Sequence, residues 1–141
     1  MRFILRLIAI TLFVLSMVSY AIEIRDVKSY IEKQVKDKTM AQYSFLTQED
    51  IVVGFLNADE DKIDNRATSF FVELTGISSF LNRTVIPVFF KDVKGELVEQ
   101  KQWVIDVEAY GDFLKTAHKV GRGKQLSVTD VELVREDIYG K

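Results

Sequence analysis

Hydrophobic residues at helical spacing dominate the chain just after residue 22. Isoleucine and valine recur there at intervals of three and four, at Ile24, Val27, Ile31 and Val35. This spacing places them on one face of a helix. Asp26 lies near the expected start, where a carboxylate can accept backbone N–H groups. The sequence therefore predicts an amphipathic helix from Glu23 to about Tyr43.

Beyond residue 50 the spacing changes to an alternation of two, which is typical of β-strands. The runs 51–56 and 69–74 are rich in β-branched and aromatic residues, so we expect one strand in each. The polar and acidic segment 57–68 lies between them and is expected to form a loop.

Two further runs, 84–90 and 102–110, predict a hairpin whose turn chemistry comes from Asp92 and Gly95. The second run alternates cleanly, whereas the first is apolar on both faces. Pro87 lies in the first run and cannot donate to a strand ladder, which favours an edge strand or a bulge. An apolar edge strand tends to pair with other chains, so this run is a first indication of a protein partner.

The first 21 residues differ from the rest of the chain. They contain no acidic residue, and an apolar run from Leu7 to Val18 follows Arg2 and Arg6. The run is shorter than the roughly 20 residues of a spanning helix, and Ser19 and Ala21 supply the small residues that a signal peptidase reads. We expect a cleavable secretory signal peptide, so the protein meets the membrane only during export.

Composition narrows the functional classes. The chain has 141 residues, of which 48% are hydrophobic and 28% charged, an ordinary globular balance. Its 19 basic residues against 21 acidic ones give a net charge of -2, without the basic excess typical of nucleic-acid-binding domains. The sequence contains no cysteine and one histidine, His118, which excludes disulfides, thiolate metal sites and cysteine nucleophiles. We expect no cofactor.

The acidic loop is the strongest candidate for a metal site. Asn57, Asp59, Asp61 and Asp64 resemble the opening of a calcium-binding loop. The required turn glycine is replaced by Lys62 and the closing carboxylate by Thr68, so we interpret the segment as a solvated acidic loop. Asp106 and Glu108 share one side of a predicted strand, and we expect both to face solvent.

The segment from His118 to Ile138, HKVGRGKQLSVTDVELVREDI, resembles the opening of an SAF domain. In this resemblance Gly123 makes the tight turn, Leu126 inserts into the core, and Ser127 or Thr129 caps one helical turn before the next strand. The matching positions are Val120, Gly121, Arg122, Gly123, Leu126, Thr129, Asp130 and Leu133. The chain ends at Lys141, soon after this motif, so we expect the later strands of an SAF module to be missing.

Together with the leader, the first helix and the hairpin that contains Trp103, this motif makes the chain similar to flagellar basal-body P-ring assembly chaperones. The resemblance implies a periplasmic protein, without enzymatic activity, that helps P-ring subunits to assemble. The expected fold class is α+β. The expected organisation is a signal peptide over residues 1–21, a helix with a small antiparallel β domain over 22–110, and a partial SAF-like (β-clip) module over 111–141.

Binding of the P-ring subunit is expected to use the apolar hairpin strand and the basic turn that follows the hairpin. The candidate contact residues are Val85, Val88, Phe90, Lys119, Arg122 and Lys124. Two other functions stay open at this point. One is a periplasmic pilus-assembly protein with an SAF-type segment, and the other is a secreted carbohydrate-acting enzyme, which would need convergent carboxylates that the sequence pattern does not display.

Overall fold

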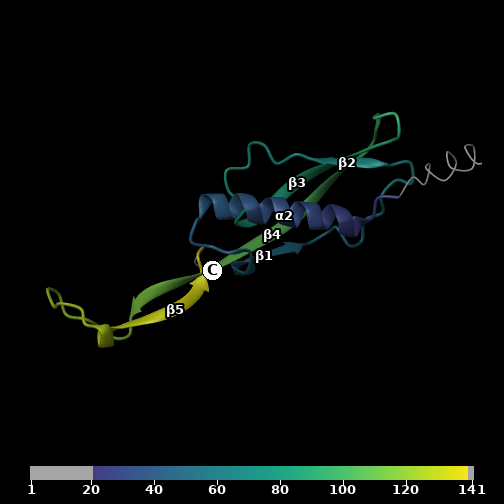
Figure 1. Ribbon diagram of the computed structural model, residues 1–141. Helices are drawn as coiled ribbons and strands as arrows, with labels where there is room; N and C mark the ends of the chain where they lie inside the picture. The colour runs from purple at the N-terminus through teal and green to yellow at the C-terminus, as the bar shows by residue number, and fades with distance from the viewer. Residues whose placement is uncertain (1–20, 140–141) are drawn as a thin grey trace, which may run out of the picture.

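The computed structural model describes residues 21–139 (Figure 1). Most of the expected signal peptide, including Ser19, lies outside the described residues, which begin at Ala21. The helices and 3₁₀ turns are α2 (Ile24–Gln42), η1 (Gln48–Asp50) and η2 (Val128–Asp130). The strands are β1 (Ile51–Phe55), β2 (Ser69–Val72), β3 (Asn82–Lys91), β4 (Leu97–Thr116) and β5 (Val131–Asp137). The expected α+β class is confirmed.

One long strand, β4, organises the antiparallel sheet. The strand order is β1-β4-β3-β2, and β5 also pairs with β4. Along the 20 residues of β4, the first half pairs with β3, residues 105–109 also pair with β1, and residues 110–116 pair with β5. The predicted hairpin is therefore confirmed. In its turn the N–H of Asp92 donates to the carbonyl of Glu96, the N–H of Gly95 donates to the carbonyl of Asp92, and Gly95 has a φ of 81°.

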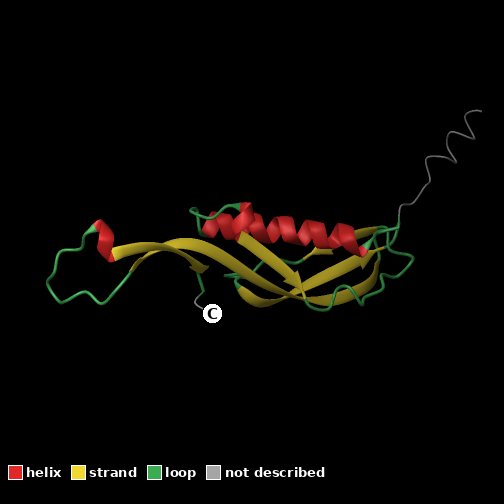
Figure 2. Ribbon diagram, turned by 90° about the horizontal axis from the view of Figure 1, so that it is seen from below, coloured by secondary structure: helices red, strands yellow, loops and turns green. Residues whose placement is uncertain are grey.

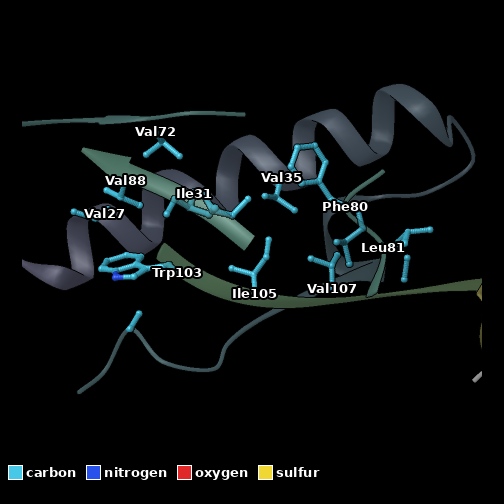
Figure 3. Packing of buried hydrophobic residues seen from close by; sticks show 14 of the residues in the cluster. Val27, Ile31, Val35, Val72, Phe80, Leu81, Val88, Trp103, Ile105 and Val107 are labelled. Carbon is cyan, nitrogen blue, oxygen red and sulfur yellow. The ribbon is translucent and has the colours of Figure 1, made fainter. Parts of the chain in front are cut away.

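The core lies between α2 and one face of the curled sheet (Figure 2). Val27, Ile31 and Val35 are completely buried, as the helical spacing predicts. Figure 3 shows these side chains packed together with those of the strand residues Val88, Trp103, Ile105 and Val107, between the helix and the sheet. The predicted amphipathic helix is confirmed almost to its ends.

The start of α2 differs from the expectation in one respect. Glu23 is the N-terminal cap, and its backbone carbonyl accepts the N–H of Asp26. Asp26 lies in the first turn, where its charge favours the helix dipole, but no side chain caps the helix by a hydrogen bond. Backbone geometry, and not a carboxylate, defines this helix end.

The strand that contains Pro87 is not an edge strand, contrary to the expectation. Over residues 88–91, β3 lies between β4 and β2. The carbonyl of Pro87 accepts the N–H of Glu73, just beyond the end of β2. The nitrogen of Pro87 faces this same side, so the proline removes no hydrogen bond from the ladder with β4.

Among the described residues, no helix has the length and apolar character to cross a membrane.

Candidate protein-binding surface

The face of the sheet that points away from α2, the outer face, has no covering layer among residues 21–139 (Figure 2). On this face, apolar side chains from four strands or strand ends form a diagonal band, the outer stripe. Its residues are Leu56, Phe71, Val85, Pro87, Phe89 and Val104. The band arises because every second residue of a strand points to the same face of its sheet.

Strand pairing holds the outer stripe together. Phe71 of β2 lies opposite Phe89 of β3, with ring centroids 5.9 Å apart. Val85 of β3 lies opposite Val104 of β4, and the N–H of Leu56 donates to the carbonyl of Val104. Large side chains in this band remain about half exposed, with Val85 at 51%. Contiguous apolar surface of this kind on a monomer is characteristic of interaction sites.

The second feature is an arm that extends from the body of the molecule (Figures 1 and 2). It consists of residues 110–137, which include the end of β4, a loop, η2 and β5. The arm is a two-stranded ribbon, and Leu114 and Leu133 lie opposite each other in it with exposures of 72% and 68%. Isolated two-stranded ribbons are marginally stable in water, so contacts with the body or with a partner are needed to hold the arm.

Contacts at the base of the arm fix its position. The N–H of Ile138 donates to the carbonyl of Ala109, so the end of β5 continues the pairing with β4 into the body. Gly111 lies at this junction, where an added Cβ would come within 3.0 Å of Ile138 and 3.1 Å of Phe45. Only glycine therefore allows the strand, Ile138 and the Phe45 ring to approach so closely.

Asp130 organises the tip of the arm. Its carboxylate accepts the backbone N–H of Ser127 at 2.9 Å and the Ser127 hydroxyl at 2.7 Å, which closes a capping box around η2. His118 Nε2 lies 2.8 Å and Lys124 Nζ 3.8 Å from the same carboxylate. The hydrogen bonds from Ser127 lower the pKa of Asp130, and those from His118 and Lys124 add to this effect. The anionic form thereby fixes the loop that carries the basic residues.

The SAF-like motif is only partly reproduced in space. Gly123 adopts the turn conformation with a φ of 80°, Ser127 caps the helical turn, and β5 begins at Val131. The expectation for Leu126 is wrong, since its side chain is 54% exposed and enters no core. The reason is that the arm has only one layer in the described structure, so no second layer exists to bury it.

The candidate partner-binding residues separate into three groups. Val85 lies on the outer stripe, whereas Lys119, Arg122 and Lys124 are exposed at the tip of the arm, far from β3 (Figure 1). Val88 and Phe90 are completely buried under α2, so their side chains cannot contact a partner in this state, and that part of the prediction is wrong. Because residues 85–90 are apolar on both faces, their spacing alone does not indicate which face is buried.

Basic and aromatic side chains partner the carboxylates of the acidic loop. Asp59 pairs with Lys28 at 2.6 Å, and Asp64 pairs with Arg66 at 2.7 Å, which lowers the pKa of Asp64 to about 2. Asp61 accepts the indole N–H of the buried Trp103 at 2.5 Å. Within residues 21–139, no group of three or more acidic or histidine side chains could hold a metal ion. The loop therefore braces β4, a role that its composition alone does not reveal.

These features define an α+β domain whose distinctive surfaces are an apolar sheet face and a projecting arm. No family model matches the chain, and no curated protein matches it. Among solved structures, the chain is similar to a monoclinic crystal structure of FlgA from Salmonella in closed form, with a TM-score of 0.40 and 16% sequence identity. The match covers 77% of this chain and 50% of the FlgA chain, so this chain spans about half the length of the structure that it matches.

Proposed function

We propose that this protein is a periplasmic chaperone that binds flagellar P-ring subunits while the ring assembles. The outer stripe is the observation that carries the proposal, because it is an apolar surface that nothing covers within residues 21–139. The leader-like N-terminus and the SAF-like motif of the sequence support the location and the family. The function needs no bond-making chemistry.

In this proposal the outer stripe captures apolar segments of a P-ring subunit that become buried once the ring has formed. Burial of apolar surface contributes about 25 cal/mol for each Å² removed from water. The affinity must stay moderate, since a chaperone releases its client to the growing ring. A stripe of half-exposed side chains on a rigid sheet fits this need, because it gains apolar contact without refolding.

The arm has a separate role in the proposal. Its exposed residues Leu126 and Val128, together with Lys119 and Arg122, lie at the tip. The tip projects away from the body, so it can contact a second part of the same subunit. Two weak contacts on one client raise the overall affinity through their effective concentration.

The test of the proposal is Val85→Asp, which places a charge in the outer stripe. Val85 is half exposed, so the fold is expected to tolerate the change, and far-UV circular dichroism checks this. Val93→Asp is the matched control, because Val93 is 84% exposed in the β3–β4 turn, away from the stripe. Binding is measured with the purified P-ring subunit, and ring assembly is measured as motility and as P-rings on isolated basal bodies.

We expect Val85→Asp to lose subunit binding and P-ring assembly, while Val93→Asp keeps both. Fractionation of the cells is expected to show both variants in the periplasm with the leader removed. Unchanged binding and assembly by a folded Val85→Asp variant would contradict the proposal, as would retention of the protein in the cytoplasm.

A further inference from the structure

The outer edge of the sheet at β1 carries unpaired backbone groups. The N–H of Leu56 donates to Val104, and pairing alternates along an antiparallel ladder. Val52 and Gly54 therefore direct their backbone groups toward β4, and Val53 and Phe55 direct theirs to the open edge. Within residues 21–139, no backbone hydrogen bond reaches Val53 or Phe55 from that side.

This edge lacks the features that normally prevent strands from pairing with other chains. Edge strands are usually protected by charged side chains, proline or a bulge. The sequence of β1 is Ile-Val-Val-Gly-Phe, with none of these, and its pairing with β4 is regular. In the acidic loop that follows, Asn57 bonds to the backbones of Gln102 and Val104 of β4, and Asp59 pairs with Lys28 of α2. Within residues 21–139, no backbone hydrogen bond joins this loop to the open edge of β1.

A groove runs beside the open edge, between β1 and α2. It has a main part of about 600 Å³ and a smaller extension of about 170 Å³ along the helix. Val53, Phe55 and Ile24 give the main part an apolar wall. A strand that pairs with β1 would place alternate side chains in this groove, as in other cases of strand addition next to a helix.

The charged side chains that line the groove favour an acidic peptide segment as the bound strand. Basic side chains outnumber acidic ones among its lining residues, which include Arg25, Lys28, Lys33 and Lys36 against Glu32 and Asp59. Each of these bases already has a carboxylate partner on the protein. Arg25 lies 3.2 Å from Glu23, Lys28 2.6 Å from Asp59, Lys33 2.9 Å from Asp37 and Lys36 2.8 Å from Glu32. Such pairs are weak, so a carboxylate of the bound segment can compete for these bases. A second copy of this chain would offer β1 itself, which contains no acidic residue to meet these bases.

We propose that the β1 edge binds an extended, acidic segment of a partner protein, which adds to the sheet as an extra strand. Backbone hydrogen bonds to Val53 and Phe55 fix the register, apolar side chains of the segment enter the groove beside Phe55, and its carboxylates face Lys33 and Lys36. The site lies at a sheet edge, separate from the outer stripe. A failed test of this site would therefore leave the proposed function of the outer stripe intact, and the reverse also holds.

The test uses a synthetic peptide of about nine residues, long enough to span the five residues of β1. Every second residue is Thr, and the positions between them carry Val in one half and Glu in the other, so that Val and Glu face the groove together. The same peptide with Lys in place of Glu is the charge control. Binding is followed by NMR, through the amide signals and hydrogen exchange of Val53 and Phe55, and by fluorescence anisotropy of labelled peptide. We expect the acidic peptide to shift and protect these two amides and the basic peptide to bind about tenfold more weakly.

Val53→Pro removes the N–H that points to the open edge and leaves the ladder to β4 intact. Val53→Ala is the matched control, because it loses the same side chain but keeps the N–H. We expect Val53→Pro to weaken the acidic peptide by about tenfold or more and Val53→Ala to bind nearly as the wild type. We expect the double variant Lys33→Glu/Lys36→Glu to bind the acidic peptide no more tightly than the basic peptide. Lys94→Glu, in the distant β3–β4 turn, should leave both affinities unchanged.

If Val53→Pro does not fold, the acidic peptide with alternate N-methylated amides replaces it, because such a peptide cannot complete a ladder. The proposal is overturned if the N-methylated peptide binds as well as the parent peptide. It is also overturned if the amides of Val53 and Phe55 do not respond, if both peptides bind equally, or if sedimentation shows a dimer of the free protein that Val53→Pro abolishes.

Discussion

Arg135 of β5 and Asp50, the last residue of η1, lie 85 positions apart in the chain and form an ion pair that ties the arm to the body of the sheet. Arg135 also approaches Asp112 at 3.6 Å. Thr47 donates to Asp50 through its backbone N–H at 2.7 Å and its hydroxyl at 2.8 Å. One carboxylate thus joins η1, the start of β1 and the arm.

This arrangement predicts how Asp50 titrates. The hydrogen bond from Arg135, followed by those from Thr47, lowers the pKa of Asp50 from 3.8 to about 2. A pKa that is lower in the folded than in the unfolded state stabilises the fold above pH 3.8, and this stabilisation is lost as the pH falls through about 2. We expect Arg135→Gln to raise the pKa of Asp50 toward 3.8, measured by NMR titration of its carboxyl carbon.

Lys115→Gln is the control for this titration, because Lys115 pairs with Glu136 in the same arm and does not contact Asp50. It should leave the titration of Asp50 unchanged. Direct observation of the Asp50 carboxyl is needed because the pKa of Asp64 is also about 2. An unchanged Asp50 midpoint in Arg135→Gln would show that the ion pair does not form in solution.

Gly111→Val should detach the base of the arm. The new side chain would begin within 3.0 Å of Ile138 and 3.1 Å of Phe45, and overpacking of this kind costs about 1–3 kcal/mol. We expect faster hydrogen exchange of the β5 amides and a lower urea midpoint. Gly54→Val is the matched control, because it adds the same side chain where a Cβ meets the carbonyl oxygen of Asp106 at an ordinary 3.5 Å. Equal effects of the two changes would refute the close approach at Gly111.

Asp61→Ala should destabilise the core beside Trp103. It removes the acceptor of the indole N–H, and a buried donor without a partner costs about 1–3 kcal/mol. Trp103 is the only tryptophan, so its fluorescence reports urea unfolding directly. Asp59→Ala removes only the exposed pair with Lys28 and should cost less than about 1 kcal/mol; a larger loss for Asp59 than for Asp61 would contradict the assigned hydrogen bond.

Thr39→Val should stabilise the protein. Thr39 lies on the buried face of α2 and is 1% exposed, and its hydroxyl has no hydrogen-bond partner among the described residues. Valine keeps the shape and removes the unsatisfied hydroxyl, so we expect a gain of about 1 kcal/mol in the free energy of unfolding. Thr39→Ser keeps the hydroxyl and loses a methyl group, so it should be destabilising; a loss of stability in Thr39→Val would indicate a bound water at this site.

The local pattern of the sequence determined the secondary structure. The spacing of Ile24, Val27, Ile31 and Val35 predicts α2 because the helical period is a property of neighbouring residues, and the clean alternation of residues 102–110 predicts β4 for the same reason. The turn at Asp92 and Gly95 is equally local, since glycine alone adopts its φ without strain.

The tertiary structure alone decided which face and which edge each strand presents. In β3 both faces are apolar, so only the position of α2 buries Val88 and Phe90 and leaves Val85 in the outer stripe. Pairing between distant segments makes β3 an inner strand and leaves β1 at the edge, and the single layer of the arm exposes Leu126. These outcomes depend on contacts between residues far apart in the chain, which no local period encodes.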